Sequence, residues 1–79
     1  MDKTTTELKP GPIGLVEAIY QDRKRIGSIV RWHTSWLAYT MRKNEAPKEF
    51  PVPEATGKDI ALVNQKIRGA AIEWLLTQT

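Results

Sequence analysis

Apolar and polar positions alternate along three short stretches in the first half of the chain. The stretches span about residues 15–21, 25–32 and 36–41, and each is rich in β-branched and aromatic residues. Such runs, bounded by polar breaks, are typical of β-strands. Because the connections between them are too short for a parallel crossover, the pattern predicts a three-stranded antiparallel meander.

Near the C-terminus, apolar residues recur every three or four positions, which is the period of an α-helix. The periodic residues are Ile60, Val63, Ile67, Trp74 and Leu75. The preceding Thr56-Gly57-Lys58-Asp59 matches the start signal of Ser or Thr followed three residues later by an acid. The sequence therefore predicts one long helix over about residues 57–76. We interpret Gly69 within it as the place where the helix crosses the sheet closely.

Two segments lack a regular period. Residues 1–12 end in Pro10-Gly11-Pro12 and are interpreted as a disordered, flexible N-terminal arm. Residues 42–56 hold three prolines and are interpreted as a loop. The order β-β-β-α over residues 13–79 predicts a single small α+β domain with the helix packed on one face of the sheet.

The other sheet face is the candidate for function, and its membership depends on the second connection. If residues 33–36 form a four-residue loop, Leu37 and Tyr39 face the helix and Trp36 lies towards the open face. If residues 33–35 form a three-residue loop, the third strand inverts and Trp36 points inward. We favour the first, because three-residue loops prefer a glycine that this segment lacks. The open face and its rims then hold Glu17, Ile19, Arg25, Gly27, Ile29, Arg31, Trp36 and Arg42.

Positive charge is concentrated in the middle of the chain. Of the 12 Lys and Arg residues, seven lie between Gln21 and Lys48, opposed there only by Asp22 and Glu45. This stretch therefore carries a net charge of +5, whereas the whole chain carries +3. The two ends each carry −1. Such an asymmetry indicates an anionic partner rather than a particular fold.

Cations interleaved with an aromatic residue on a sheet are typical of a nucleic-acid-binding surface. Lys and Arg neutralise phosphates, and Trp stacks on a base. The predicted nucleic-acid-binding residues are Arg23, Lys24, Arg25, Arg31, Trp36, Arg42 and Lys43. The order β-β-β-α is similar in outline to the sheet-reading domains of tyrosine recombinases and to plant AP2 domains, in which the sheet contacts DNA. The likeness is one of architecture alone, with no family motif in the chain.

The same sheet face also fits a protein-interaction module, such as a small regulator, an inhibitor or an adaptor. Ile29 and Trp36 are exposed in the favoured register and rimmed by polar residues, a combination that marks docking patches and homodimer seams.

Catalytic and metal chemistry is not predicted. The chain has no cysteine and a single histidine, His33, which is too few ligands for a structural zinc site. His33 beside Thr34 and Ser35 is no catalytic triad, and the glycines form no phosphate-binding motif. We expect a non-enzymatic protein without cofactor, metal or small-molecule substrate. The lack of a long apolar run or a secretory signal leads us to expect no membrane partner and a cytoplasmic location.

Overall fold

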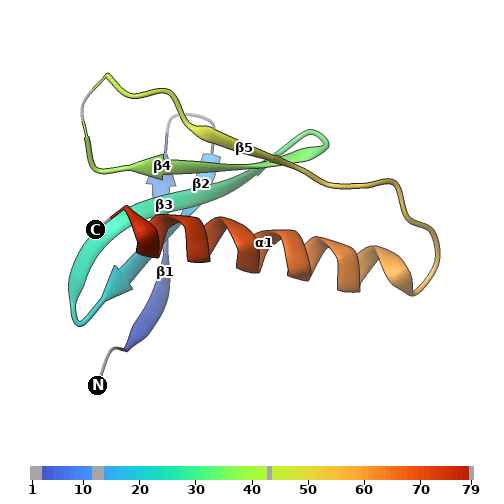
Figure 1. Cartoon of the computed structure of the whole chain (residues 1–79), viewed down its shortest axis with the longest axis horizontal. Coiled ribbons are helices and arrows are strands. Elements are labelled where there is room, and N and C mark those ends of the chain that lie inside the picture. The colour runs from blue at the N-terminus through green and yellow to red at the C-terminus, as the bar shows by residue number, and fades with distance from the viewer. Residues whose placement is uncertain (1–2, 12–13, 43, 79) are drawn as a thin grey trace.

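The computed structural model describes residues 3–11, 14–42 and 44–78. Five strands form one antiparallel sheet in the order β1-β2-β3-β4-β5, and one C-terminal helix packs on it (Figure 1). The elements are β1 Thr4–Gly11, β2 Gly14–Gln21, β3 Lys24–Trp32, β4 Ser35–Thr40, β5 Lys48–Pro51 and α1 Asp59–Thr77. The predicted α+β class, with a C-terminal helix on a sheet, is confirmed.

The sheet has five strands, and the prediction of three was wrong. β1 lies in the stretch that we interpreted as a disordered arm, of which Met1, Asp2 and Pro12 lie outside the described residues. Its Thr4-Thr5-Thr6 run is β-branched, which favours a strand. Pro10 is tolerated because β1 is an edge strand, where an N–H on the outer side is not needed.

β5 is the second strand that the pattern missed. It occupies four residues within the predicted loop 42–56 and ends at Pro51, on the opposite edge of the sheet. The residue after β5 is also bonded to the β3–β4 turn, because the backbone N–H of Val52 donates to the carbonyl oxygen of Thr34 at 2.8 Å. A short edge strand beside prolines has little periodic signal of its own.

The helix covers the sheet face opposite to the one that we predicted. α1 packs against β3, β4 and β5. The core beneath it holds Ile19, Ile26, Ile29, Trp36, Ala38, Ala71 and Leu75. Val16, Tyr20, Val30, Leu37 and Tyr39, expected under the helix, belong to the other face. Both faces carry apolar side chains at alternate positions, so alternation alone does not specify which one the helix takes.

A bulge in the β2–β3 hairpin changes the face of one cation. Tyr20 pairs with Arg25, whereas the next pair is Ile19 with Gly27, so Ile26 is the extra residue. Such a bulge breaks the alternation of side chains along a strand. Arg25 therefore lies on the uncovered face with Tyr20, while Gly27 lies under the helix.

The β3–β4 connection is a two-residue turn, shorter than either predicted loop. Trp32 pairs with Ser35, and His33 in the turn has a left-handed φ of 54°. The pairing of Arg31 with Trp36 keeps these side chains on one face, as in the favoured register. That face is the one under α1.

The start of α1 lacks the predicted side-chain cap. Lys58 occupies the N-cap position without a capping hydrogen bond. The backbone N–H groups of Asp59 and Ile60 donate instead to the carbonyl oxygens of Thr56 and Gly57, at 3.3 and 3.4 Å. These turn-like bonds satisfy donors that a cap would otherwise satisfy.

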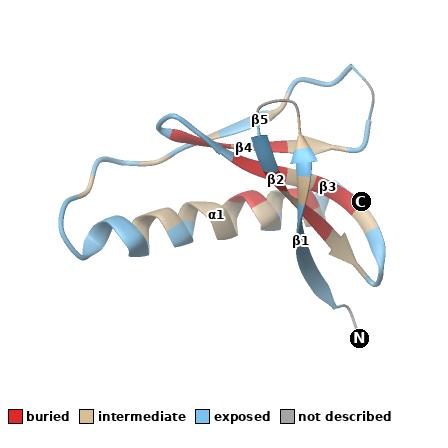
Figure 2. Ribbon diagram, turned by 180° about the vertical axis from the view of Figure 1, so that it is seen from behind, coloured by how far each residue is buried: buried red, intermediate tan, exposed pale blue. Residues whose placement is uncertain are grey.

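The glycine at which helix and sheet come into close contact is Gly27 rather than Gly69. A Cβ atom at Gly27 would lie 2.7 Å from Leu75 Cδ2 and 2.4 Å from the carbonyl oxygen of Tyr39, whereas nothing lies within 4 Å of one at Gly69. Leu75 and Ala71 are fully buried. Burial is accordingly concentrated in β2 to β4 and the C-terminal half of α1, while β1 is almost entirely exposed (Figure 2).

We predict opposite effects of alanine at these two glycines. Gly27→Ala should lower the free energy of unfolding by about 1–3 kcal/mol, because the added methyl group would lie too close to the carbonyl oxygen of Tyr39 and to Leu75. Gly69→Ala, inside the helix and in open space, should raise it by about 0.5–1 kcal/mol. Urea denaturation measures both. Equal effects would contradict the placement of the helix.

Candidate functional site

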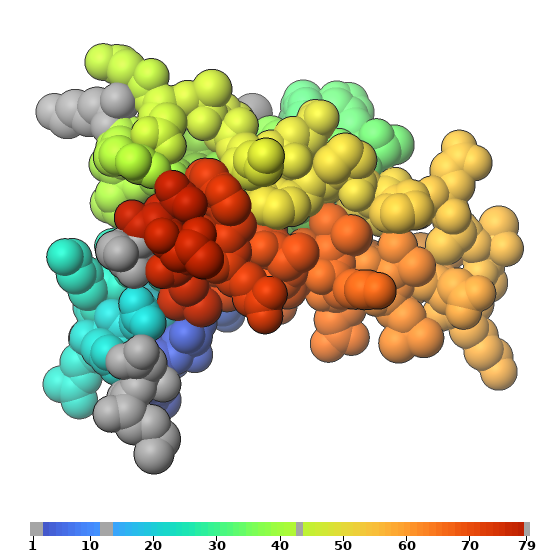
Figure 3. Space-filling model, in the orientation of Figure 1, coloured from blue at the N-terminus to red at the C-terminus, as the bar shows by residue number. Residues whose placement is uncertain are grey.

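Five cationic residues gather at one end of the molecule, which we call the basic end: Lys3, Arg23, Lys24, Arg25 and Arg42. Lys24, Arg25 and Arg42 line one groove, and Lys3 and Arg23 line a hollow on the other side of the β2–β3 turn. Figure 3 shows this turn (cyan) beside the C-terminal end of α1 (red). The basic end therefore brings together one residue near the N-terminus and four from the middle of the sequence.

The turn at its tip holds Arg23 in an unusual backbone conformation. Asp22 and Arg23 both have positive φ angles, 53° and 71°, as a two-residue hairpin turn with a primed geometry requires. Asp tolerates this region, but for most residues other than glycine it costs about 1–2 kcal/mol. Glycine is the usual residue at such positions, so the hairpin keeps a cation at its tip at a conformational cost.

β1 ties Lys3 to the same end. The backbone N–H of Asp22 donates to the carbonyl oxygen of Lys3 at 2.9 Å, and the N–H of Lys3 donates to Asp22 Oδ1 at 3.0 Å. Asp22, an acid among the cations, is thereby engaged in closing the sheet. Lys3 was not among the predicted site residues, because residues 1–12 were interpreted as a disordered arm. The signal that could have revealed it is the β-branched run Thr4-Thr5-Thr6.

The groove at the basic end is open and has a volume of about 540 Å³. Its lining residues are Gln21, Asp22, Lys24, Arg25, Ile26, Thr40, Met41, Arg42 and Gln78. Arg25 is half-buried, and its Nε atom is buried without a hydrogen-bond partner among the described residues. Arg25 also lines a smaller hollow of about 190 Å³ with Val30 and Tyr39. It therefore connects the groove to the uncovered sheet face.

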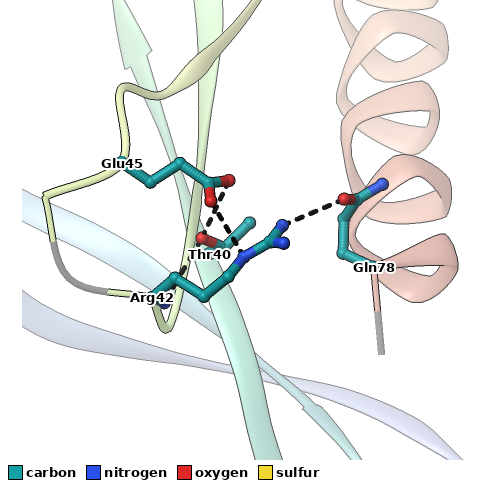
Figure 4. A network of polar contacts seen from close by, with 4 residues as sticks. All are labelled: Thr40, Arg42, Glu45 and Gln78. Atoms are coloured by element: carbon teal, nitrogen blue, oxygen red, sulfur yellow. Dashed lines mark hydrogen bonds and ion pairs between the residues drawn. The ribbon is translucent and has the colours of Figure 1, made fainter.

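Arg42 is held in place by a small polar network (Figure 4). Its Nε lies 2.9 Å from Glu45 Oε2, and its Nη2 donates to Gln78 Oε1 at 3.1 Å. Thr40 Oγ1 donates to Glu45 Oε1 at 3.3 Å and accepts from the backbone N–H of Arg42, also at 3.3 Å. The network joins the end of β4 to the end of α1, and Glu45 offsets part of the charge of Arg42.

The structure does not bring Arg31 and Trp36 to the basic end. β3 runs from Lys24 to Trp32, so Arg31 lies at the opposite end of that strand. Trp36 is only 7% exposed, and its Nε1 donates to Asn64 Oδ1 at 3.0 Å. Arg31 donates to the same oxygen, and also to the carbonyl oxygen of His33 at 3.1 Å. Lys43, the remaining predicted site residue, lies outside the described residues.

A second ion pair fixes the helix over the sheet. Arg68 on α1 donates to both carboxylate oxygens of Glu17 on β2, with Nε at 3.0 Å from Oε1. The hydrogen bond that Arg68 donates to Glu17 raises the pKa of Arg68 above its ordinary value, despite partial burial that acts in the other direction. The guanidinium therefore stays charged, and the bidentate geometry restricts the orientation of α1.

In residues 3–11, 14–42 and 44–78, no group of three or more His, Cys, Asp or Glu side chains could hold a metal ion. Over the same residues, no helix is both long enough and apolar enough to cross a membrane.

In comparisons with known proteins, no family model, no curated protein and no solved structure matches the chain.

We predict that Asn64 is a structural partner of Trp36. Asn64→Ala should lower the free energy of unfolding by about 1–3 kcal/mol, because the indole N–H of Trp36 loses its acceptor in a partly buried site. Asn64→Asp keeps the acceptor and serves as the matched control. Urea denaturation followed by Trp fluorescence checks this, and an Asn64→Ala loss no larger than that of the control would argue against the role.

Proposed function

We propose that this chain is a small, non-enzymatic nucleic-acid-binding module that contacts the phosphate backbone with its basic end. The observation that carries the proposal is the convergence of Lys3, Arg23, Lys24, Arg25 and Arg42 on one end of the molecule. They come from the residue before β1, the β2–β3 hairpin and the segment after β4. Chain segments distant in sequence thus contribute to one positive surface.

The shape of this end suits a nucleic acid. The β2–β3 hairpin closes in a two-residue turn, so its tip is narrow, and a two-stranded ribbon fits the major groove of a duplex. Lys and Arg that neutralise phosphates release condensed counterions, and this release favours binding at low salt. Lys24 is exposed and Arg25 is half-buried beside it, so the groove offers charge with little need for rearrangement.

The backbone of Arg23 supports a functional reading of the tip. A glycine at φ 71° would relieve the conformational cost, yet an arginine stands there. Residues kept in sparsely populated conformations cluster at functional sites. Arg23 stands at the tip of the hairpin, where contact with phosphate would offset this conformational cost.

The alternative function, a protein-docking patch on the predicted open face, depends on side chains that α1 covers. Ile29 is fully buried under α1, and Trp36 is bonded to Asn64. An interaction through those side chains would require the helix to leave the sheet. The proposed contact at the basic end requires no such change.

We predict a selective loss of binding when the hairpin cations are removed. Arg23→Gly with Lys24→Ser should weaken binding to a fluorescent random-sequence DNA duplex by about tenfold or more, because charge-assisted hydrogen bonds contribute about 1.5–3 kcal/mol each. It should also lower the slope of log affinity against log salt by about 1.8, the value for two lost phosphate contacts. Anisotropy titrations at several salt concentrations measure both quantities.

The matched control removes the same charge elsewhere. Lys58→Ser with Lys66→Ser eliminates two exposed cations away from the hairpin. Lys58 is the N-cap of α1, and Lys66 lies within the helix. This variant should keep most of the affinity. Equal losses for the two double variants would show that net charge alone drives binding and would contradict a site at the basic end.

We further predict that stability and binding separate at Arg23. Arg23→Gly alone should keep or raise the free energy of unfolding, by up to about 1 kcal/mol, because relief of the left-handed strain exceeds the entropy that glycine adds to the unfolded chain. The same variant should bind the duplex more weakly. A variant that is both less stable and unchanged in binding would argue that Arg23 serves the fold.

A further inference from the structure

β1 is an edge strand with little cover. It is eight residues long and pairs with β2 alone, while α1 packs on β3, β4 and β5. Residues 4–8 are exposed along the whole run. A long exposed edge offers backbone donors and acceptors to another strand.

The direction of these backbone groups follows from one hydrogen bond between the residue after β2 and the residue before β1. The carbonyl oxygen of Lys3 accepts from the N–H of Asp22, so Lys3 points its backbone groups at β2. In an antiparallel ladder this orientation alternates along the strand. The N–H and C=O groups of Thr4, Thr6 and Leu8 therefore point outward, away from the sheet.

The side chains of β1 add an apolar contact and two opposite charges. Leu8 is 63% exposed, and Leu15, paired with Pro10 on the neighbouring strand, is 64% exposed. They lie on the helix side of the sheet, beyond the reach of α1. On the other side, Lys9 Nζ lies 3.2 Å from Glu7 Oε1.

We propose that β1 pairs with β1 of a second copy of this chain, antiparallel and centred on Leu8. In that register Leu8 stands opposite Leu8 of the second copy. Glu7 stands opposite Lys9 of the second copy, and the reverse pair forms by symmetry. The two five-stranded sheets then join into one of ten strands. An isologous contact of this kind closes as a dimer.

Charge and the length of the paired segment select this register among those that the backbone allows. Outward groups must meet outward groups, so the two-fold axis passes through one of the residues from Thr5 to Lys9. An axis at Thr6 sets Lys9 against Lys3 of the second copy, an axis at Glu7 sets the two Glu7 side chains together, and an axis at Lys9 sets the two Lys9 side chains together. Like charges directly opposite destabilise a strand pair. The axes at Thr5 and Leu8 both pair opposite charges. The axis at Thr5 sets Glu7 against Lys3 of the second copy but joins only residues 3–7 of those described, whereas the axis at Leu8 joins residues 5–11 and also sets the two Leu8 side chains together.

Pro10 limits the pairing without preventing it. In the register centred on Leu8, the two Leu8 residues exchange both backbone hydrogen bonds. Thr6 stands opposite Pro10 of the second copy, where the N–H of Thr6 donates to the carbonyl oxygen of Pro10. Pro10 has no N–H to return, so the ladder stops there. This restricts the edge to one short dimer contact.

The test measures mass by sedimentation velocity from about 10 µM to 1 mM, together with a charge reversal and its rescue. The wild-type chain of 9.0 kDa should shift to twice that mass as concentration rises. Lys9→Glu, which sets Glu7 against a second acid in both symmetric pairs, should raise the dimer dissociation constant by about tenfold. The double reversal Glu7→Lys with Lys9→Glu restores opposite charges and should restore the dimer.

A second variant tests the backbone contact. Leu8→Pro removes an outward N–H and an apolar side chain while leaving the hydrogen bonds to β2, and should abolish the dimer. Circular dichroism reports whether each variant is folded. If Leu8→Pro does not fold, the two charge variants decide the test. A wild-type monomer throughout the range would overturn the proposal. A dimer indifferent to Lys9→Glu, or one that the double reversal fails to restore, would overturn it equally.

Discussion

The contact of Leu75 with Gly27 determines how the rest of the molecule is arranged. Only a residue without a side chain lets the helix approach the sheet this closely, since a Cβ atom there would lie 2.7 Å from Leu75 Cδ2. With Leu75 over β3, the end of α1 lies beside the β2–β3 hairpin. Gln78 then reaches Arg42, and both line the groove with Lys24 and Arg25. The hydrophobic contact therefore positions a polar site that it does not itself contain.

The same contact determines which side chains are available to a partner. Ile29 and Trp36 are covered by α1, and Asn64 accepts hydrogen bonds from Trp36 and Arg31. A buried indole N–H needs such a partner. These side chains thus stabilise the helix–sheet contact, and the proposal of an anionic partner rests on the cations of the basic end.

Local patterns predicted the elements better than their arrangement. β2, β3, β4 and α1 lie within one or two residues of the predicted ranges, because their apolar periods are strong. The predicted covered face was wrong because both sheet faces carry apolar residues. Arg25 still lies on the uncovered face, where it was predicted, because the bulge at Ile26 puts it on the opposite side from Gly27 and Ile29. A glycine in mid-strand was a better indicator of close helix packing than the glycine in mid-helix.

The site was partly predictable for a related reason. Arg23, Lys24 and Arg25 are adjacent in sequence, and any hairpin between the first two predicted strands presents them together. Arg42 joins them through the network with Glu45 and Gln78, and Lys3 through pairing of an edge strand. Both contacts are long-range. Edge strands exposed on both faces, such as β1, carry little period for a sequence pattern to reveal.

The most direct test of the central claim is a map of where a nucleic acid touches the protein. Isotope-labelled protein would be titrated with a short random-sequence DNA duplex and observed by amide and indole NMR at low and moderate salt. The account predicts shifts at Lys3, Arg23, Lys24, Arg25 and Arg42 that diminish as salt is added, with the Trp36 indole signal unmoved. Shifts centred on Trp36 and Arg31, or no shifts at low salt, would contradict it.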